Sequence, residues 1–231
     1  MAVLYSYVLR YDDGAAPNPF WDVCTLTICK PGIRRTAVGG DWVIGTGSVN
    51  ARCNDGHYHD FSSMLVYAMK VTQRLSLPDY DRHCQKHLPE KIPVKRHPDW
   101  HKRMGDCIYD YSRGDFPAIR LGVHDEGNRA TDLSGQNALL STHFYYFGEQ
   151  PIPFPRHLLH LVKDGRGCKK ITLPDSVLAF ETWISAFPIN VLAANPQLKH
   201  CFDGSPDDAN LAQCGICQLT EDRLDDEEVV C

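Results

Sequence analysis

A short run rich in glycines and hydroxyl groups is the part of this chain best suited to hold a small ligand. Residues 39–48 read GGDWVIGTGS, so a Gly-Gly-Asp turn opens an apolar stretch that ends in glycines and a serine. Gly45 and Gly47 are expected to leave a strand edge without side chains, where a flat ligand could approach the backbone. Thr46 and Ser48 would offer hydroxyls to the edge of a base. Nucleobase recognition is one interpretation of this pattern, but the glycines taken alone favour a tight hairpin in which they are structural.

Three basic residues carry groups suited to phosphates or base carbonyls: Arg10, Lys30 and Arg34. A guanidinium can hold such oxygens through two parallel hydrogen bonds. Period-two alternation places Arg10 on one strand face with Leu4 and Val8, and it is predicted to point toward the interior. The opposite face is predicted to carry Tyr5, Tyr7, Leu9 and Tyr11. A buried arginine needs a carboxylate, which Asp12 or Asp41 could supply. A ligand role and a structural ion pair therefore both remain open.

Candidate acid–base residues are few. Asp41, which can also cap its turn, His143 and Asp12 are the candidates that the pattern offers. Ser141 shares a predicted strand face with His143, which resembles a nucleophile beside a base. Residues two apart on a strand lie about 7 Å apart, however, too far for a direct hydrogen bond. No convincing catalytic set is predicted, and His143 is kept as a base-contacting or acid–base residue.

Aromatic side chains on predicted strands supply surfaces on which a base can stack. Most of them are expected in the core, which leaves roughly one or two to face a ligand. The candidates are Trp42, Tyr67, Phe144, Tyr145 and Tyr146.

Two groups of residues have the side chains of zinc ligands. One combines Cys53, His57 and His59 in a polar segment. The other combines Cys201, Cys214 and Cys217, and its last pair has the Cys-x2-Cys spacing of a zinc knuckle. A structural zinc at the second group is one hypothesis, and an exposed polar loop and a tail with spare thiols are the alternatives. The sequence leaves any other cofactor unknown.

The sequence pattern predicts that these residues are positioned by strands, which are followed by a few helices. The pattern predicts a hairpin or insertion over 49–63. It shows no regular β-α-β alternation, no Gly-x-Gly-x-x-Gly after a strand and no phosphate-loop Gly-Lys-Ser/Thr. An α+β fold around a mixed or barrel-like sheet follows. Strands are predicted over 4–11, 23–29, 42–46, 65–72 and 137–147, and helices over 33–38, 79–87, 157–162 and from a cap at Asp175 to about 187.

Several stretches resemble a known family, the nucleotide modification associated domain, type two. They are YSYVLRY at 5–11, APNPF at 16–20, CTLTICKP at 24–31, GDWVIGTGS at 40–48 and LLSTHFYYFG at 139–148. The fourth stretch, joined to LVYAMKV at 65–71, also resembles the core of the PUA, ASCH and EVE barrels, whose members bind RNA or single modified bases. The resemblance implies a PUA/EVE-like fold with peripheral helices and a role in phage or bacterial systems that hypermodify DNA bases. It implies no particular reaction and no catalytic residues.

Composition sets the remaining bounds. The chain has 231 residues, of which 43% are hydrophobic and 23% charged, so a real core is expected. We expect one α+β domain over 1–197 and a polar, cysteine-containing acidic tail over 198–231. No apolar run is long enough to span a bilayer and no signal-peptide layout opens the chain, which predicts a cytoplasmic protein. The family resemblance implies that the cell is bacterial or phage-infected. Most of the ten cysteines are expected to be reduced thiols.

The formal net charge of −5 argues against a protein that coats DNA without specificity. Six acidic residues crowd positions 221–231, so the rest of the chain is close to neutral. Three functions are therefore weighed. The first is recognition of a nucleotide or modified base, alone or within DNA, and the second is a transferase or hydrolase acting on such a base. The third is an interaction protein of phage–host conflict, whose acidic tail would bind a protein partner.

Overall fold

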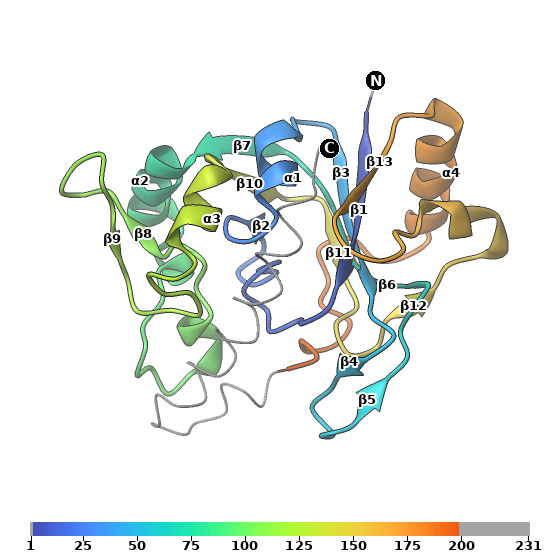
Figure 1. Cartoon of the computed structure of the whole chain (residues 1–231), viewed down its shortest axis with the longest axis horizontal. Helices are drawn as coiled ribbons and strands as arrows, with labels where there is room; N and C mark the ends of the chain where they lie inside the picture. The colour runs from blue at the N-terminus through green and yellow to red at the C-terminus, as the bar shows by residue number, and fades with distance from the viewer. Residues whose placement is uncertain (1, 199–231) are drawn as a thin grey trace.

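Two β-sheets form the framework of the molecule, which is described over residues 2–198 by a computed structural model (Figure 1). The larger sheet has the strand order β11-β6-β3-β1-β13, and β12 also pairs with β6. The β1 and β3 strands are parallel, whereas the other pairs of this sheet are antiparallel. Its strands are β1 (Leu4–Leu9), β3 (Trp42–Gly47), β6 (Met64–Lys70), β11 (Phe144–Tyr146), β12 (Ile152–Pro153) and β13 (Cys168–Ile171).

The smaller sheet is antiparallel and has the order β2-β10-β7. Its strands are β2 (Cys24–Leu26), β10 (Asn137–Ser141) and β7 (Gln73–Ser76). Two further hairpins pair β4 (Ala51–Arg52) with β5 (Tyr58–His59) and β8 (Tyr109–Asp110) with β9 (Ala118–Ile119). The helices are α1 (Pro31–Thr36), α2 (Leu77–His87), α3 (Arg129–Ser134) and α4 (Pro174–Ile184), with 3-10 turns at Pro89–Lys91, Trp100–Arg103 and Arg156–Leu161.

The alternation along β1 divides the core into two layers, as the sequence predicts. Tyr5, Tyr7 and Leu9 join one buried cluster with residues of β2, β10 and α1. Leu4 points the other way and packs in a second cluster with Trp42 and Phe180 of α4. The large sheet therefore has α4 on one face and the small sheet with α1 on the other (Figure 1).

The predicted α+β class and mixed sheet are confirmed. Within residues 2–198 the sheets do not close into a barrel. The hairpin predicted within 49–63 is confirmed as β4 and β5. None of the helices in this part of the chain is both long and apolar enough to cross a bilayer. The tail predicted over 198–231 lies outside the described residues from position 199 onward.

The strand predicted over 137–147 is in fact two strands in different sheets. The hydroxyl of Ser141 donates to the carbonyl of Lys70 at 2.6 Å and accepts the amide of His143 at 3.1 Å. These bonds stabilise a break, after which β11 pairs with β6 instead of with β2 and β7. Ser141 and His143 therefore do not share the face of one strand, and the Ser141 hydroxyl serves the backbone.

Two helix boundaries also differ from prediction. Leu173 is the N-cap residue of α4, and Asp175 lies in the first turn without a capping hydrogen bond. Pro174 explains the earlier start, because the fixed φ of proline suits the first helical position. The same preference places Pro31 at the start of α1, which spans 31–36 rather than 33–38.

Candidate functional site

A cleft of about 560 Å³ lies where the end of β1, the turn after β3 and the loop before β13 meet. We refer to it as the basic cleft. Apolar, hydroxyl and charged side chains all line it. The lining residues are Val8, Arg10, Gly47, Ser48, Val49, Ser62, Ser63, Leu159, Val162, Lys163, Asp164, Gly165, Arg166 and Gly167.

The charges of the basic cleft are unbalanced. Arg10, Lys163 and Arg166 contribute cations, whereas Asp164 is its one carboxylate. Exposed apolar side chains stand among them, and Val49 is 59% exposed. The cleft therefore offers both apolar surface and positive charge to a ligand.

Some of the predicted ligand-binding residues line this cleft and others do not. Gly47, Ser48 and Arg10 line it. The inward orientation predicted for Arg10 is wrong, because β1 ends at Leu9 and Arg10 beyond it is exposed. Its guanidinium lies 5.6 Å from the ring centroid of Tyr11.

The glycines of the predicted motif do not leave an open strand edge. The β3 strand lies inside the large sheet, hydrogen-bonded to β1 on one side and to β6 on the other. A Cβ at position 45 would overlap the ring of Tyr67, and one at position 47 would overlap Phe61. The space beside Gly45 is thus filled by a side chain, and the space beside Gly47 by the backbone and Cβ of Phe61.

The predicted stacking aromatics are core residues. Trp42 is buried against Phe180 and donates its indole N–H to Glu181 at 2.8 Å. The Tyr67 hydroxyl is 2.9 Å from that of Tyr7, and Tyr145 is also buried. The Thr46 hydroxyl is also buried and donates a hydrogen bond to the Tyr7 carbonyl at 3.2 Å. None of these groups lines the basic cleft.

The predicted acid–base residues lie apart from one another in structural roles. The capping role of Asp41 is confirmed, since its carboxylate accepts the amides of Val3 and Val38 at 2.8 and 2.9 Å. Asp12 is fully buried and both of its oxygens accept from the Tyr146 hydroxyl at 2.7 Å. Burial, with a smaller effect of the Lys70 charge, lowers the pKa of His143.

No three His, Cys, Asp or Glu side chains within residues 2–198 are placed to hold a metal ion. Cys53, His57 and His59 are therefore not a metal site. The first is buried, whereas the two histidines lie beside Asp55 in the exposed β4–β5 hairpin. Cys201, Cys214 and Cys217 lie outside the described residues, and the zinc hypothesis for them stays a prediction.

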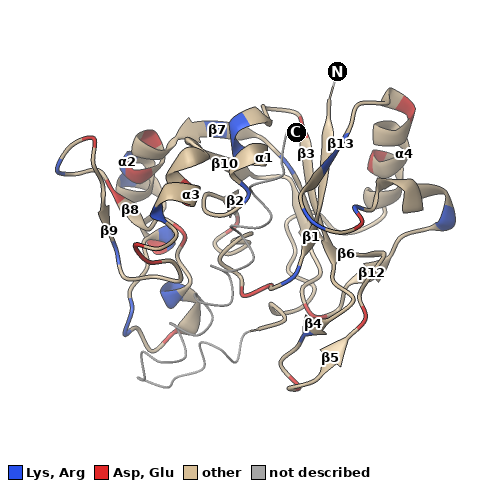
Figure 2. Cartoon of the chain, viewed as in Figure 1, with Lys and Arg blue, Asp and Glu red and all other residues tan. Residues whose placement is uncertain are grey.

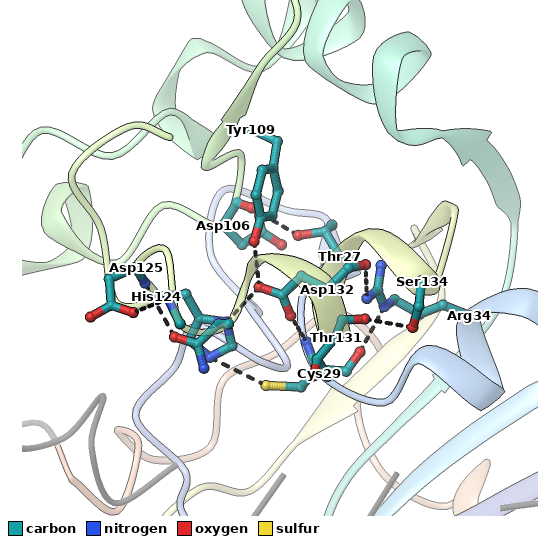
Figure 3. A network of polar contacts seen from close by, with 12 residues as sticks. Thr27, Cys29, Arg34, Asp106, Tyr109, His124, Asp125, Thr131, Asp132 and Ser134 are labelled. Atoms are coloured by element: carbon teal, nitrogen blue, oxygen red, sulfur yellow. Dashed lines mark hydrogen bonds and ion pairs between the residues drawn. The ribbon is translucent and has the colours of Figure 1, made fainter. Parts of the chain in front are cut away.

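A second constellation, which sequence patterns did not indicate, lies at the junction of α1, α3 and the loop before α3 (Figure 3). The Cys29 sulfur is 3.5 Å from Nε2 of His124, and Nδ1 of the same ring is 2.7 Å from Oδ2 of Asp132. Oδ2 also accepts from the Tyr109 hydroxyl at 2.9 Å. We call these residues, with Arg34, the thiol network.

The charge state of the thiol network follows from its hydrogen bonds. Burial alone would raise the pKa of Asp132, but the charge and hydrogen bond of His124, the Arg34 guanidinium and the Cys29 amide together lower it. The carboxylate is therefore ionised near neutral pH and cannot donate. Nδ1 of His124 therefore donates to this carboxylate, and Nε2 is the ring nitrogen that faces the Cys29 sulfur.

Charged groups also hold the backbone of Cys29. Its φ is 56°, and that of Lys30 is 42°, so two consecutive side-chain-bearing residues adopt left-handed conformations. The Cys29 amide donates to Oδ1 of Asp132 at 2.8 Å, and its carbonyl accepts from Nε of Arg34 at 2.7 Å. Such conformations cost about 1–2 kcal/mol each and persist only where the surroundings enforce them.

The predicted ligand residues Lys30 and Arg34 flank this thiol. The Arg34 guanidinium is fully buried and also donates to the carbonyls of Asp132 and Asn137 at 2.6 and 3.0 Å. Gly135 makes room for it, because a Cβ there would overlap the guanidinium. Nζ of Lys30 lies 5.1 Å from the ring centroid of Tyr7, within the distance of a cation–π contact.

Comparison with known proteins identifies the family of the chain. The family model described as nucleotide modification associated domain 2 matches residues 1–203. The chain belongs to this family. Neither a curated protein nor a solved structure is similar enough to match it. Membership of the nucleotide modification associated domain 2 family indicates a role in nucleotide modification.

In this nucleotide modification associated domain, the thiol network unites residues that are far apart in sequence. Cys29 precedes His124 by 95 positions and Asp132 by 103. The sequence contains a cysteine, a histidine and an aspartate at distant positions. Such residues can form a catalytic set in the fold, but their spacing along the chain does not reveal it. The five free cysteines in the described part of the chain are buried, so burial of the thiol did not mark Cys29 either.

Proposed function

We propose that this protein recognises a nucleotide or a modified nucleobase, alone or within DNA, in the basic cleft. The supporting observation is that one cleft of about 560 Å³ combines apolar walls, serine hydroxyls and three cations. Sites for small molecules have volumes of about 300–1,000 Å³ and are mainly apolar with a few polar groups. Membership of a nucleotide modification family supports the same ligand class.

Each part of a nucleotide has a counterpart among the lining residues. Val8, Val49 and Leu159 offer apolar surface to the flat base. Ser48 and its neighbouring serines offer hydroxyls to the sugar, and the three cations offer charge-assisted hydrogen bonds to the phosphate. Asp164 among these cations would disfavour ligands of very high negative charge. A mononucleotide or one nucleotide of a strand is therefore the ligand class that we favour.

The setting that we propose is the cytoplasm of a bacterial or phage-infected cell in which modified DNA bases are made. We also include the resemblance to PUA and EVE proteins in this proposal, because members of those families bind single modified bases. Here the ligand would lie between the end of β1 and the loop before β13, rather than inside a closed barrel.

Calorimetric titration tests the proposal with the four 2′-deoxynucleoside 5′-monophosphates and the matching nucleosides. We expect at least one monophosphate to bind with a Kd between about 1 μM and 1 mM. The nucleoside should bind about tenfold more weakly, because it lacks the charge-assisted bonds.

Substitutions of matched charge locate the site. Arg10→Gln and Arg166→Gln each remove one cation from the cleft and should weaken binding of the monophosphate by about tenfold. Arg113→Gln removes the same charge from the segment between β8 and β9 and should leave the Kd unchanged. Equal effects of all three variants, or no binding at millimolar concentration, would contradict the proposal.

A further inference from the structure

One thiol among the described cysteines has a histidine beside it. The Cys29 sulfur is 3.5 Å from Nε2 of His124. The Cys53 thiol instead contacts the carbonyl of Ala51, and the Cys107 thiol contacts a carboxylate and an arginine. Burial raises the pKa of the Cys24 thiol to about 12 and that of Cys53 to about 11. These two thiols stay protonated near neutral pH and are poor nucleophiles.

The imidazole is oriented for proton transfer from this thiol. Nδ1 of His124 donates to Asp132, so Nε2 is the nitrogen that faces the sulfur (Figure 3), and in the neutral ring it can accept the proton of the thiol. Asp132 is fixed in turn by the Tyr109 hydroxyl and by the Cys29 amide. A nucleophile, a base within reach and a third group that orients the base form the arrangement found in enzymes that use covalent catalysis.

The backbone supports the same interpretation. Cys29 lies between β2 and α1 in a left-handed conformation that its side chain does not favour. Asp132 and Arg34 bind the amide and the carbonyl of this one residue, and both of these charged side chains are fully buried. Strained backbone that is held by buried charges is concentrated at functional sites.

We propose that Cys29 is the nucleophile of an acyl-transfer site in which His124 is the general acid–base and Asp132 is the positioning residue. The substrate class is an amide or ester carried by, or to be attached to, a nucleotide. This activity goes beyond recognition in the basic cleft, and no residue of that cleft takes part in it.

The reaction needs an acyl acceptor as its second reactant but no oxidant or reductant. The Cys29 thiol gives its proton to Nε2 of His124 while its sulfur forms a bond with the carbonyl carbon of the substrate. The imidazolium then gives that proton to the leaving nitrogen or oxygen as the carbon–nitrogen or carbon–oxygen bond breaks. Water or a nucleotide amine or hydroxyl attacks the resulting thioester, loses its proton to His124 and regenerates the thiol.

Thiol alkylation of the full-length chain gives the first test. The probe is iodoacetamide, and peptide mass mapping measures the rate at each cysteine. Cys53 is the internal control, because it is 5% exposed and Cys29 is 7% exposed. We expect Cys29 to react at least about tenfold faster near neutral pH, since its proton can pass to His124.

Replacement of His124 separates a reactive thiol from a merely accessible one. His124→Gln should lower the alkylation rate at Cys29 by about tenfold or more and leave the rate at Cys53 unchanged. Tyr109→Phe removes one hydrogen bond from Asp132 while leaving its charge. It should shift the pH profile of Cys29 alkylation, which a purely structural hydroxyl would not do.

An acyl donor tests the reaction class. Incubation with p-nitrophenyl acetate should acetylate Cys29 and release p-nitrophenol in a burst, and Cys29→Ser should abolish the burst while circular dichroism shows an unchanged fold. Acetylation spread evenly over the cysteines, or alkylation of Cys29 no faster than of Cys53, would overturn the proposal. Neither assay contains a nucleotide, so failure here is distinguishable from failure of recognition in the basic cleft.

Discussion

At the scale of single residues, the buried charged groups of Asp41 and Arg34 bind the backbone. Asp41 binds two amides, and Arg34 binds three carbonyls. A buried polar group that lacks a partner costs roughly 1–3 kcal/mol. These bonds therefore stabilise turns, whose backbone groups have no partners in a helix or a sheet. Asp132 differs from both, because its second oxygen binds the imidazole of His124 rather than another backbone group.

Asp12 gives a pH dependence that can be measured. Burial raises its pKa to about 7, although hydrogen bonds from Tyr146 and from two backbone amides oppose the shift. The unfolded chain releases this proton near pH 3.8, whereas the folded chain retains it up to about pH 7. The contribution of Asp12 to stability is therefore fully present below about pH 3.8 and is lost as the pH rises through about 7.

Replacement of Asp12 by asparagine should remove that dependence. Between pH 5 and pH 8, ionisation of Asp12 should lower the free energy of unfolding of the native chain by about 2–3 kcal/mol. In the Asp12→Asn variant this decrease should be absent. Urea denaturation at the two pH values measures it. Asp60→Asn, at an exposed carboxylate, is the matched control and should follow the native profile. Parallel profiles for the native and Asp12→Asn chains would refute the assignment.

At the scale of elements, the sequence predicted the two faces of a strand better than it predicted where strands begin and end. Period-two alternation in 4–11 correctly separated the two sides of β1, because burial on each side selects apolar residues. It could not show that the chain leaves one sheet for the other at Ser141, because both halves of 137–147 are equally β-prone. The glycines of β3 likewise carry no sign that Tyr67 and Phe61 fill the space beside them.

The docking of α4 on the large sheet supplies a stability prediction. Phe180 is completely buried and packs against Trp42, whereas Leu178 on the same helix is 62% exposed. Phe180→Ala should lower the free energy of unfolding by about 3–5 kcal/mol, because it removes a buried ring and leaves a cavity. Leu178→Ala should change it by less than about 0.5 kcal/mol. Urea denaturation compares the two, and equal losses would show that α4 is not docked in this way.

At the scale of the whole molecule, the two candidate sites differ in what could be foreseen. The basic cleft includes Arg10, Gly47 and Ser48, which the sequence selected because their types suit phosphates and bases. The loop from Lys163 to Gly167 was not selected, since only folding brings it to the end of β1. The thiol network was not predicted for the same reason, because more than ninety positions separate its cysteine from its histidine.

Charge at this scale is evenly mixed over the described part of the chain and uneven along the sequence. Figure 2 shows basic and acidic residues interspersed around both sheets. The last eleven residues contain six acidic residues and one arginine, which account for the whole formal net charge of −5. If the protein binds nucleotides within DNA, this charge repels the strand at long range, and salt screens the repulsion.

Deletion of 221–231 should therefore strengthen binding of a short single-stranded oligonucleotide at low ionic strength by several-fold, on the order of 1 kcal/mol. The gain should vanish near 0.5 M salt, where the Debye length falls to roughly 4 Å. Fluorescence anisotropy at both salt concentrations measures it. Replacing the six carboxylates by amides is the control, because it removes the charge and preserves the length. A deletion that weakens binding while the amide variant does not would show that the segment contributes contacts instead of repulsion. Unchanged affinity in both variants would mean that the acidic residues act on a protein partner or on none.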